Sequence, residues 1–339
     1  MSEPVLEVEG LSVAIRERDG EFSPVDRVSL AVAPGECLGL VGESGSGKSL
    51  TLKAILGLLP PVARVSGGEV RFGVDAPPRV VAPEEIRGSG VAMVFQEPMS
   101  ALNPLMRAGA LIAEACRSEA EANGTRADAR ALELMREVGI PGAEERMRAY
   151  PHELSGGLRQ RVMIAMALAR EPRVLLCDEP TTAVDVTLQS QILRLLDRVR
   201  ADRGLAVVYV THDLAVVGQI CERVAVMYAG RVVETGPVTE VFRAPAHPYT
   251  LELLRSVPRL DGDRASLDSI GGAVPDPRSF PSGCRFHPRC FMAQSDCPGA
   301  KHGLLDAGPD RLTACIHHAG LPAERKARVP RTEAGRDAQ

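Results

Sequence analysis

Short apolar runs recur along the first 230 residues of the chain, and polar residues follow each run closely. The runs cover residues 37–41, 91–95, 174–177 and 205–210. They are almost continuously apolar instead of alternating with polar residues, which is typical of parallel strands covered by helices on both faces. The pattern predicts an α/β fold around a parallel sheet. Because such sheets bind ligands beyond the carboxyl ends of their strands, the residues that follow the runs are candidates for a functional site.

The first run leads into a glycine-rich loop that matches the phosphate-binding pattern G-x-x-x-x-G-K-[ST]. Its glycines can turn successive N–H groups toward a phosphate. A helix with Leu52, Ile55, Leu56 and Leu59 along one face is expected to follow, with its N-terminus facing the same anion. The lysine adds charge at the β- and γ-phosphates, and the last serine is placed to bind Mg²⁺. A plain strand-to-helix turn is the alternative, but the context favours nucleotide binding. The loop consists of Gly42, Glu43, Ser44, Gly45, Ser46, Gly47, Lys48 and Ser49.

The other three runs are followed by Gln96, by Asp178 and Glu179, and by His212. Taken singly, each would be an ordinary loop, hairpin or capping residue. Beside a phosphate loop they take distinct roles: Asp178 is expected to hold Mg²⁺ through water, with Gln96 beside the metal. Glu179 is the candidate general base for the attacking water. His212 is expected to contact the γ-phosphate.

A second anion site is predicted where a helix begins after Ser155. The helical stripe that follows ends before Pro172, so Ser155 is a natural N-cap, and Gly156 and Gly157 leave the first N–H groups of the helix open. A glycine-rich cap without a ligand is the simpler alternative. The chain thus has a second phosphate-binding helix but no second phosphate loop. This is explained if the helix completes the nucleotide pocket of another subunit.

Composition narrows the class of protein. The 339 residues carry a formal net charge of −4, which gives no general reason to bind nucleic acid. Apolar residues make up 45% of the chain, yet no run of about 18 of them predicts a membrane-spanning helix. The first residues show no signal-peptide pattern. We therefore expect a soluble, intracellular protein that reaches a membrane only through a partner.

Four of the eight cysteines are scattered in apolar segments and are expected in the core, whereas the other four gather near the C-terminus. Disulfides are not expected in a reducing compartment, so a bound metal is favoured over free thiols. The spacing lacks the close cysteine pairs that zinc usually prefers, but His287, His302, His317 and His318 leave a mixed zinc site open. The clustered cysteines are Cys284, Cys290, Cys297 and Cys315.

Together these motifs resemble the ATP-binding subunits of ABC transporters over residues 5–255. Leu158 and Val184 stand where Met and Leu are commoner in the family, and Ile15 and Phe22 are the candidates for contact with adenine. The family's motifs are the phosphate loop at 42–49, the Q-loop at Gln96, the signature at 154–160, the Walker B segment at 174–179, the D-loop at 183–185 and the switch histidine His212.

The oligopeptide/dipeptide importer branch is the most similar, on the segments 95–104, 178–187, 247–250 and 251–258. The resemblance implies a P-loop NTPase cassette with a parallel-sheet core, an antiparallel β subdomain and a helical subdomain at about 97–165. It further implies a cysteine-bearing extension at 256–320, before a disordered tail at 321–339.

The resemblance also implies function. The chain would hydrolyse ATP with Mg²⁺, at the cytoplasmic face of the membrane, to energise uptake of short peptides. Its partners would be permease subunits, a second ATP-binding subunit and, indirectly, a solute-binding protein. The four cysteines would bind a [4Fe–4S] cluster. The alternatives are uptake of nickel or another small solute, a soluble ABC-type ATPase outside transport, and a non-catalytic regulatory subunit.

Overall fold

The computed structural model describes residues 3–18, 20–74, 77–88, 90–117, 124–182, 185–256 and 270–321. Its main sheet has eight strands in the order β11-β12-β10-β9-β3-β8-β7-β6. β3 pairs in parallel with β8 and β9, and β7 pairs in parallel with β6 and β8. The four strands expected from the sequence are confirmed, and all lie in this parallel part. The bounds are β3 Cys37–Val41, β6 Val91–Val94, β7 Val174–Asp178, β8 Ala206–Thr211, β9 Arg223–Tyr228, β10 Arg231–Pro237, β11 Leu305–Gly308 and β12 Arg311–Thr313.

The continuous apolar runs are explained by two cores, one on each face of the sheet. Along β7, Leu175 and Cys177 belong to a core shared with α7 (Gly156–Leu168) and α8 (Val186–Arg203). Val174 and Leu176 belong to the opposite core, which includes α1 (Lys48–Ile55). Because both faces are buried, no position of the strand is left for a polar residue until its carboxyl end.

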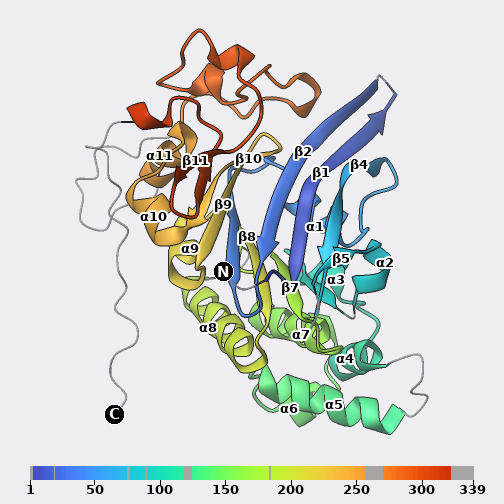
Figure 1. The fold of residues 1–339 in the computed structure, drawn as a ribbon. Coiled ribbons are helices and arrows are strands. Elements are labelled where there is room, and N and C mark those ends of the chain that lie inside the picture. The colour runs from blue at the N-terminus through green and yellow to red at the C-terminus, as the bar shows by residue number, and fades with distance from the viewer. Residues whose placement is uncertain are drawn as a thin grey trace, which may run out of the picture.

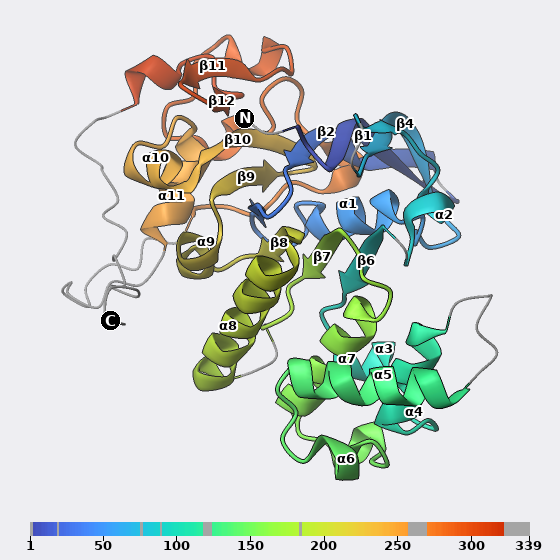
Figure 2. The same cartoon turned by 60° about the horizontal axis from the view of Figure 1, so that its bottom comes forward.

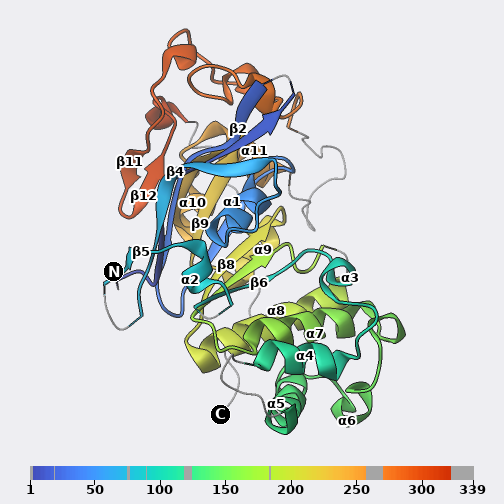
Figure 3. The same ribbon diagram turned by 90° about the vertical axis from the view of Figure 1, so that its right-hand side faces the viewer.

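A second, antiparallel sheet packs with α1 over one face of the main sheet (Figure 3). Its strands run in the order β2-β1-β4-β5. This is the antiparallel β subdomain that the sequence resemblance implied, and it holds Ile15 and Phe22 as paired neighbours on β1 and β2. The bounds are β1 Leu6–Glu17, β2 Gly20–Val32, β4 Ala63–Phe72 and β5 Arg79–Val80, with the short helix α2 at Pro83–Ile86.

A helical subdomain lies at the end of the molecule that is opposite to the C-terminal segment (Figure 2). It follows Gln96 directly and closes with α7, so it lies where helices were expected. The insertion therefore begins at the carboxyl end of β6, and α7 leads back to the amino end of β7. Its elements are α3 Pro98–Ala101, α4 Ala108–Cys116, α5 Gly124–Glu137, α6 Ala143–Arg146 and the 3₁₀ turn η1 Pro151–Glu153.

The C-terminal segment 270–321 forms loops over β9 and β10 and adds β11 and β12 to the main sheet (Figure 1). β12 pairs antiparallel with β10. Arg311 of β12 reaches the buried carboxylate of Glu234 at 3.3 Å. Before this segment come α9 Leu214–Ile220, α10 Val238–Arg243 and α11 Pro248–Arg255.

The C-terminal segment 270–321 also contains short 3₁₀ turns. They are η2 Pro277–Ser279, η3 His287–Arg289, η4 Cys297–Gly299 and η5 His318–Gly320. Among the described residues, no helix combines the length and the apolar character needed to cross a bilayer. The expected tail lies almost wholly outside the described residues, as does most of the segment between 256 and 270.

Candidate nucleotide and metal sites

One pocket gathers residues from four separate strand ends, as the sequence predicted. The phosphate loop follows β3, Gln96 follows β6, Glu179 follows β7 and His212 follows β8. Because these strands are parallel neighbours, their carboxyl ends open onto one edge of the sheet. The pocket is lined by Pro24, Ser44, Gly45, Gly47, Lys48, Ser49, Leu50, Gln96, Glu179 and His212.

The phosphate loop requires glycine where the backbone passes close to β9. A Cβ atom added at Gly42 would lie 2.1 Å from the carbonyl oxygen of Met227. Gly47 has φ +100° and caps α1, whose first N–H groups have no partner within the helix. The buried Ser46 hydroxyl also finds no hydrogen-bond partner among the described residues. The N–H groups at the start of α1 and the Ser46 hydroxyl are thus hydrogen-bond donors that could bind a phosphate anion.

Lys48 is buried, and its ammonium Nζ donates to the carbonyl oxygens of Gly42 and Glu43 at 2.8 and 2.9 Å. Burial lowers the pKa of Lys48, against the opposing effect of Glu179, Asp178 and Glu43. The side chain is thus held by two carbonyls at the mouth of the loop. A phosphate oxygen would supply the full negative charge that such a buried ammonium lacks.

Asp178 and Ser49 meet beside the loop. The Ser49 hydroxyl donates to the Asp178 carboxylate at 2.7 Å, and burial raises the pKa of Asp178. Together with the side-chain oxygen of Gln96 they offer the hydroxyl, carboxylate and amide oxygens that Mg²⁺ prefers. A bound cation would also favour the ionised form of the buried carboxylate. The donor set therefore fits magnesium.

Glu179 is held at the pocket wall by three neighbours. Its Oε2 atom accepts from the Thr182 hydroxyl at 2.8 Å and lies 3.3 Å from Nδ1 of His212 and 3.5 Å from Nε2 of Gln96. The backbone of Glu179 has φ +45°, a conformation that non-glycine residues rarely adopt. Thr182 was not singled out from the sequence. The turn after β7 thus fixes one carboxylate oxygen in a defined position.

The signature residues lie elsewhere. Ser155 caps α7 as predicted, accepting from the Leu158 N–H at 3.4 Å. Ser155 and Gly156 are exposed, and Gly157 is buried against Leu188 of α8. None of the three lines the pocket of the phosphate loop. Of the predicted D-loop, Asp185 caps α8, while 183–184 lie outside the described residues.

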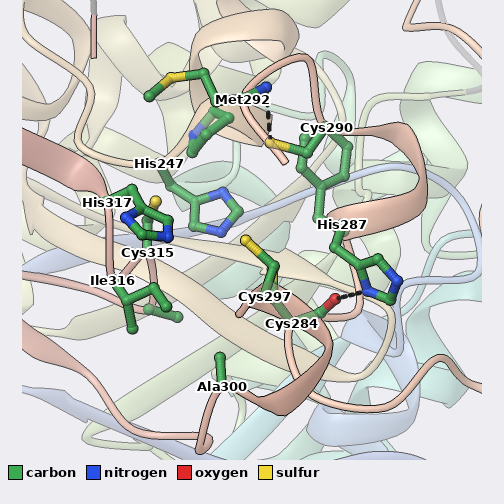
Figure 4. A pocket seen from close by; sticks show the side chains of 13 residues that line it. His247, Cys284, His287, Cys290, Met292, Cys297, Ala300, Cys315, Ile316 and His317 are labelled. Carbon is green, nitrogen blue, oxygen red and sulfur yellow. Dashed lines mark hydrogen bonds between the residues drawn. The ribbon is translucent and has the colours of Figure 1, made fainter. Parts of the chain in front are cut away.

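The four C-terminal cysteines line a second cavity, together with histidines from three different segments (Figure 4). Phe286, one of its walls, packs against Tyr228 and Tyr249 with ring centroids 5.1 and 5.4 Å apart. The cavity is lined by His247, Pro248, Cys284, Phe286, His287, Cys290, Met292, Cys297, Ala300, Ala314, Cys315, Ile316 and His317. The clustering expected from the sequence is therefore present in space.

Backbone N–H groups point at the sulfur atoms of this cavity. The Met292 N–H donates to Sγ of Cys290, and the Gln294 N–H donates to Sγ of Cys297, both at 3.4 Å. Burial raises the pKa of Cys290 and of Cys315 to about 11, so both thiols are neutral near pH 7. A metal would replace their protons, and amide donors stabilise the resulting thiolates.

The four histidines that lie near these cysteines in the sequence occupy different places in the structure. His287 and His317 line the cysteine cavity, but His302 lines a neighbouring one, and His318 lies outside it with Nδ1 3.0 Å from the Cys315 carbonyl oxygen. Asp296, Cys297 and His317 could hold a metal ion, because their ligand atoms lie within 4.8 Å of one another. Of the four histidines near the cysteines in the sequence, two therefore line the cysteine cavity and two do not.

Two residues linked to this cavity were not predicted from the sequence. His247 is buried in its wall, and Arg289, next to Cys290, forms an ion pair with Glu43 of the phosphate loop at 2.9 Å. The only sequence signal was the segment 247–250, which carried the family resemblance without an assigned role.

Two segments of the chain match the models of known protein families. The family described as "ABC transporter" matches residues 25–182. The family described as "Oligopeptide/dipeptide transporter, C-terminal region" matches residues 233–297. The second match covers three of the four clustered cysteines.

The curated relatives are similar over most of their length. A protein of Brucella abortus (strain 2308), named as a peptide import ATP-binding protein, is 45% identical over 336 residues, covering 95% of this chain and 99% of the relative. A protein of the same description from Brucella suis biovar 1 (strain 1330) is 47% identical over 299 residues, covering 87% and 89%.

Solved structures are similar to the cassette. The ATP-binding cassette MJ0796, described as a dimer in a post-hydrolysis state bound to ADP and Pi, matches with a TM-score of 0.60 and 28% identity over 69% of this chain and 98% of that one. The protein cbiO1 from Clostridium perfringens, described as part of the ABC transporter complex cbiONQ, matches with a TM-score of 0.59 and 29% identity over 71% and 91%.

Proposed function

This chain belongs to the ATP-binding subunits of ABC transporters, in the oligopeptide/dipeptide branch, and on this premise we propose the roles of its residues in binding and hydrolysing ATP. The protein is an ATPase whose activity energises the uptake of peptides or related solutes by an importer. The observation that carries the function is the convergence of four strand ends on one pocket.

Binding of ATP falls to the phosphate loop. Lys48 and the N–H groups at the start of α1 hold the β- and γ-phosphates, exchanging the present contacts of the ammonium with Gly42 and Glu43 for phosphate oxygens. Ser49, Asp178 and Gln96 hold Mg²⁺, which neutralises phosphate charge when bound.

Glu179 acts as the general base. It takes a proton from a water molecule while the water oxygen bonds to the γ-phosphorus and the bond to the β–γ bridging oxygen breaks, giving ADP and phosphate. Thr182 and His212 hold the Glu179 carboxylate in place. His212, more than half exposed at the rim, is placed to contact the γ-phosphate.

The signature helix serves a second ATP-binding subunit. Ser155 and Gly156 are exposed and lie outside the pocket of their own phosphate loop, which supports contact with a nucleotide bound elsewhere. The dimeric cassette among the structural neighbours supports the same arrangement. Two chains would thus share two ATP molecules at their interface.

The helical subdomain offers a surface for permease subunits. Leu105, after α3, is 85% exposed, and Met99 within α3 is 47% exposed, both close in the chain to Gln96. Large exposed apolar side chains are typical of interaction surfaces. A subunit held there lies peripherally at the cytoplasmic face of the membrane, and the solute is chosen by the permease and a solute-binding protein.

The proposed function is tested by purifying the assembled complex, identifying its chains and measuring peptide-stimulated ATP hydrolysis in vesicles. A complex without permease chains would contradict it.

The cysteine cavity holds a metal centre, which we assign to a [4Fe–4S] cluster bound by Cys284, Cys290, Cys297 and Cys315. The convergence of four sulfurs, two of them with amide donors, supports this assignment. A zinc ion bound by Asp296, Cys297 and His317 is the second candidate, favoured by the proximity of their ligand atoms.

Metal analysis separates these candidates. Protein purified without oxygen is expected to be brown, with about four irons per chain, as four-cysteine ligation implies. Cys290→Ser should remove the iron and make the segment after residue 280 more sensitive to protease. Cys116→Ser, which changes a cysteine of the helical subdomain that packs on the core, is the matched control and should keep the iron. Stoichiometric zinc without visible absorption would overturn the cluster, and protein without any metal would overturn both candidates.

A further inference from the structure

The C-terminal segment contacts the phosphate loop at Glu43. Arg289 is 6% exposed, and its two terminal nitrogens lie 2.9 and 3.1 Å from the two carboxylate oxygens of Glu43. The Tyr249 hydroxyl accepts a hydrogen bond from the backbone N–H of Glu43 at 2.8 Å. Both the side chain and the backbone of this loop residue are therefore fixed by residues outside the cassette's own nucleotide motifs.

The same two residues adjoin the cysteine cavity. Arg289 directly precedes Cys290, and the Tyr249 N–H donates to Nδ1 of His247 at 3.1 Å. Tyr249 is fully buried, with its ring 4.6 Å from that of Tyr228. Each contact with Glu43 thus starts within two residues of the cavity wall, and the aromatic packing leaves Tyr249 little freedom to adjust.

His247 indicates that this wall is built for an occupant. Burial lowers the pKa of His247 to about 3, so the ring is neutral. Because Nδ1 accepts from Tyr249, the ring proton resides on Nε2. That Nε2 atom is buried and has no hydrogen-bond partner among the described residues, although the ring lines the cavity with the four cysteines (Figure 4). A sulfur or other electron-rich atom in the cavity would satisfy it.

From these contacts we propose that the occupied cysteine cavity sets the affinity of the phosphate loop for ATP, with Arg289 and Tyr249 as positioning residues. The physical reason lies in the charge of Glu43. A carboxylate within a loop that binds a polyanion opposes binding unless it is paired, and Arg289 provides the pairing charge. If the cavity empties and the loops around Cys290 loosen, Arg289 withdraws and Glu43 repels the phosphates. The proposal rests on the proposed function in that the loop binds ATP.

Equilibrium binding of a fluorescent ATP analogue to the full-length, metal-loaded chain tests the pairing. Arg289→Met is expected to weaken binding about tenfold at unchanged metal content, by leaving Glu43 unpaired. Adding Glu43→Gln to this variant should restore most of the affinity, because it removes the uncompensated charge. A purely structural role of Arg289 would not be rescued in this way. Arg243→Met is the control, since Arg243 of α10 also pairs with a carboxylate, that of Glu240, and neither residue lines the nucleotide pocket. It should bind as the unaltered chain does.

A second arm tests the dependence on the cavity. Cys290→Ser should lose its metal and weaken ATP binding several-fold, and adding Arg289→Met should cause little further loss. Tyr249→Phe, which lies outside the cavity lining, should weaken binding with the metal retained. Unchanged affinity in Arg289→Met, absence of rescue by Glu43→Gln, or full affinity in metal-free Cys290→Ser would each overturn the inference. Failure of the unaltered chain to bind the analogue would instead overturn the proposed function.

Discussion

Replacing Glu179 with Gln is expected to leave ATP binding intact and to lower hydrolysis by about 10²–10⁴-fold, the usual loss when a general base is removed. The amide has the shape of the carboxylate but cannot take the proton from water. The phosphate loop, which provides the binding energy, is unchanged. Steady-state ATP hydrolysis by the assembled transporter and equilibrium nucleotide binding measure the two effects.

Glu171→Gln provides the control for this variant. Glu171 also has a positive φ, at +53°, but its side chain is exposed and pairs with Arg130 of the helical subdomain. Its replacement should leave hydrolysis unchanged. Turnover near that of the unaltered protein in Glu179→Gln would remove Glu179 from the role of base.

Gly156→Asp is expected to abolish ATP-driven pairing of two subunits while each monomer still binds ATP. A Cβ atom at Gly156 would meet nothing within 4 Å, and an acidic residue in the first turn of a helix is favourable, so the variant should fold. Across the interface its carboxylate would face the γ-phosphate. Two unit charges about 4 Å apart repel by about 4 kcal/mol at an effective dielectric of 20, which is close to a thousandfold in the pairing constant.

Light scattering with and without ATP, in the Glu179→Gln background that prevents hydrolysis, measures the pairing. Gly156→Ala is the matched control and should pair normally. Gly157 is unsuitable for this experiment, because a Cβ atom there would lie 2.5 Å from Cδ1 of Leu188 and disturb α8. Equal loss of ATP binding by the Gly156→Asp monomer would mean that the signature helix serves its own subunit.

The nucleotide pocket was predictable because local patterns determine it. Two-sided burial makes β7 continuously apolar up to Asp178, so the sequence itself marks the strand end where chemistry begins. The N-cap at Ser155 depends only on its own turn and the helix that follows. Glycine, lysine and serine at fixed spacing specify the loop at 42–49, since the loop folds around its own backbone.

Long-range contacts could not be read in this way. Arg289 and Glu43 are separated by 246 positions, and neither has a local pattern that identifies its partner. His247 is far from the cysteines in sequence and reaches their cavity only because α11 packs against Phe286. The short strands β11 and β12 carry no clear alternation that would predict them, and they are held by long-range pairing: β12 pairs with β10, and β11 pairs with β12.

That pairing makes the C-terminal segment difficult to dispense with. A chain cut before residue 280 would leave β10 at the margin of the main sheet with its N–H and C=O groups open to any other extended chain. It would also leave the buried carboxylate of Glu234 without its ion pair to the guanidinium of Arg311. Shortened versions of this protein are thus expected to self-associate through bare β10 edges. Studies of the cassette alone would then report on aggregation, because the edge of β10 is covered only in a chain that extends through β12.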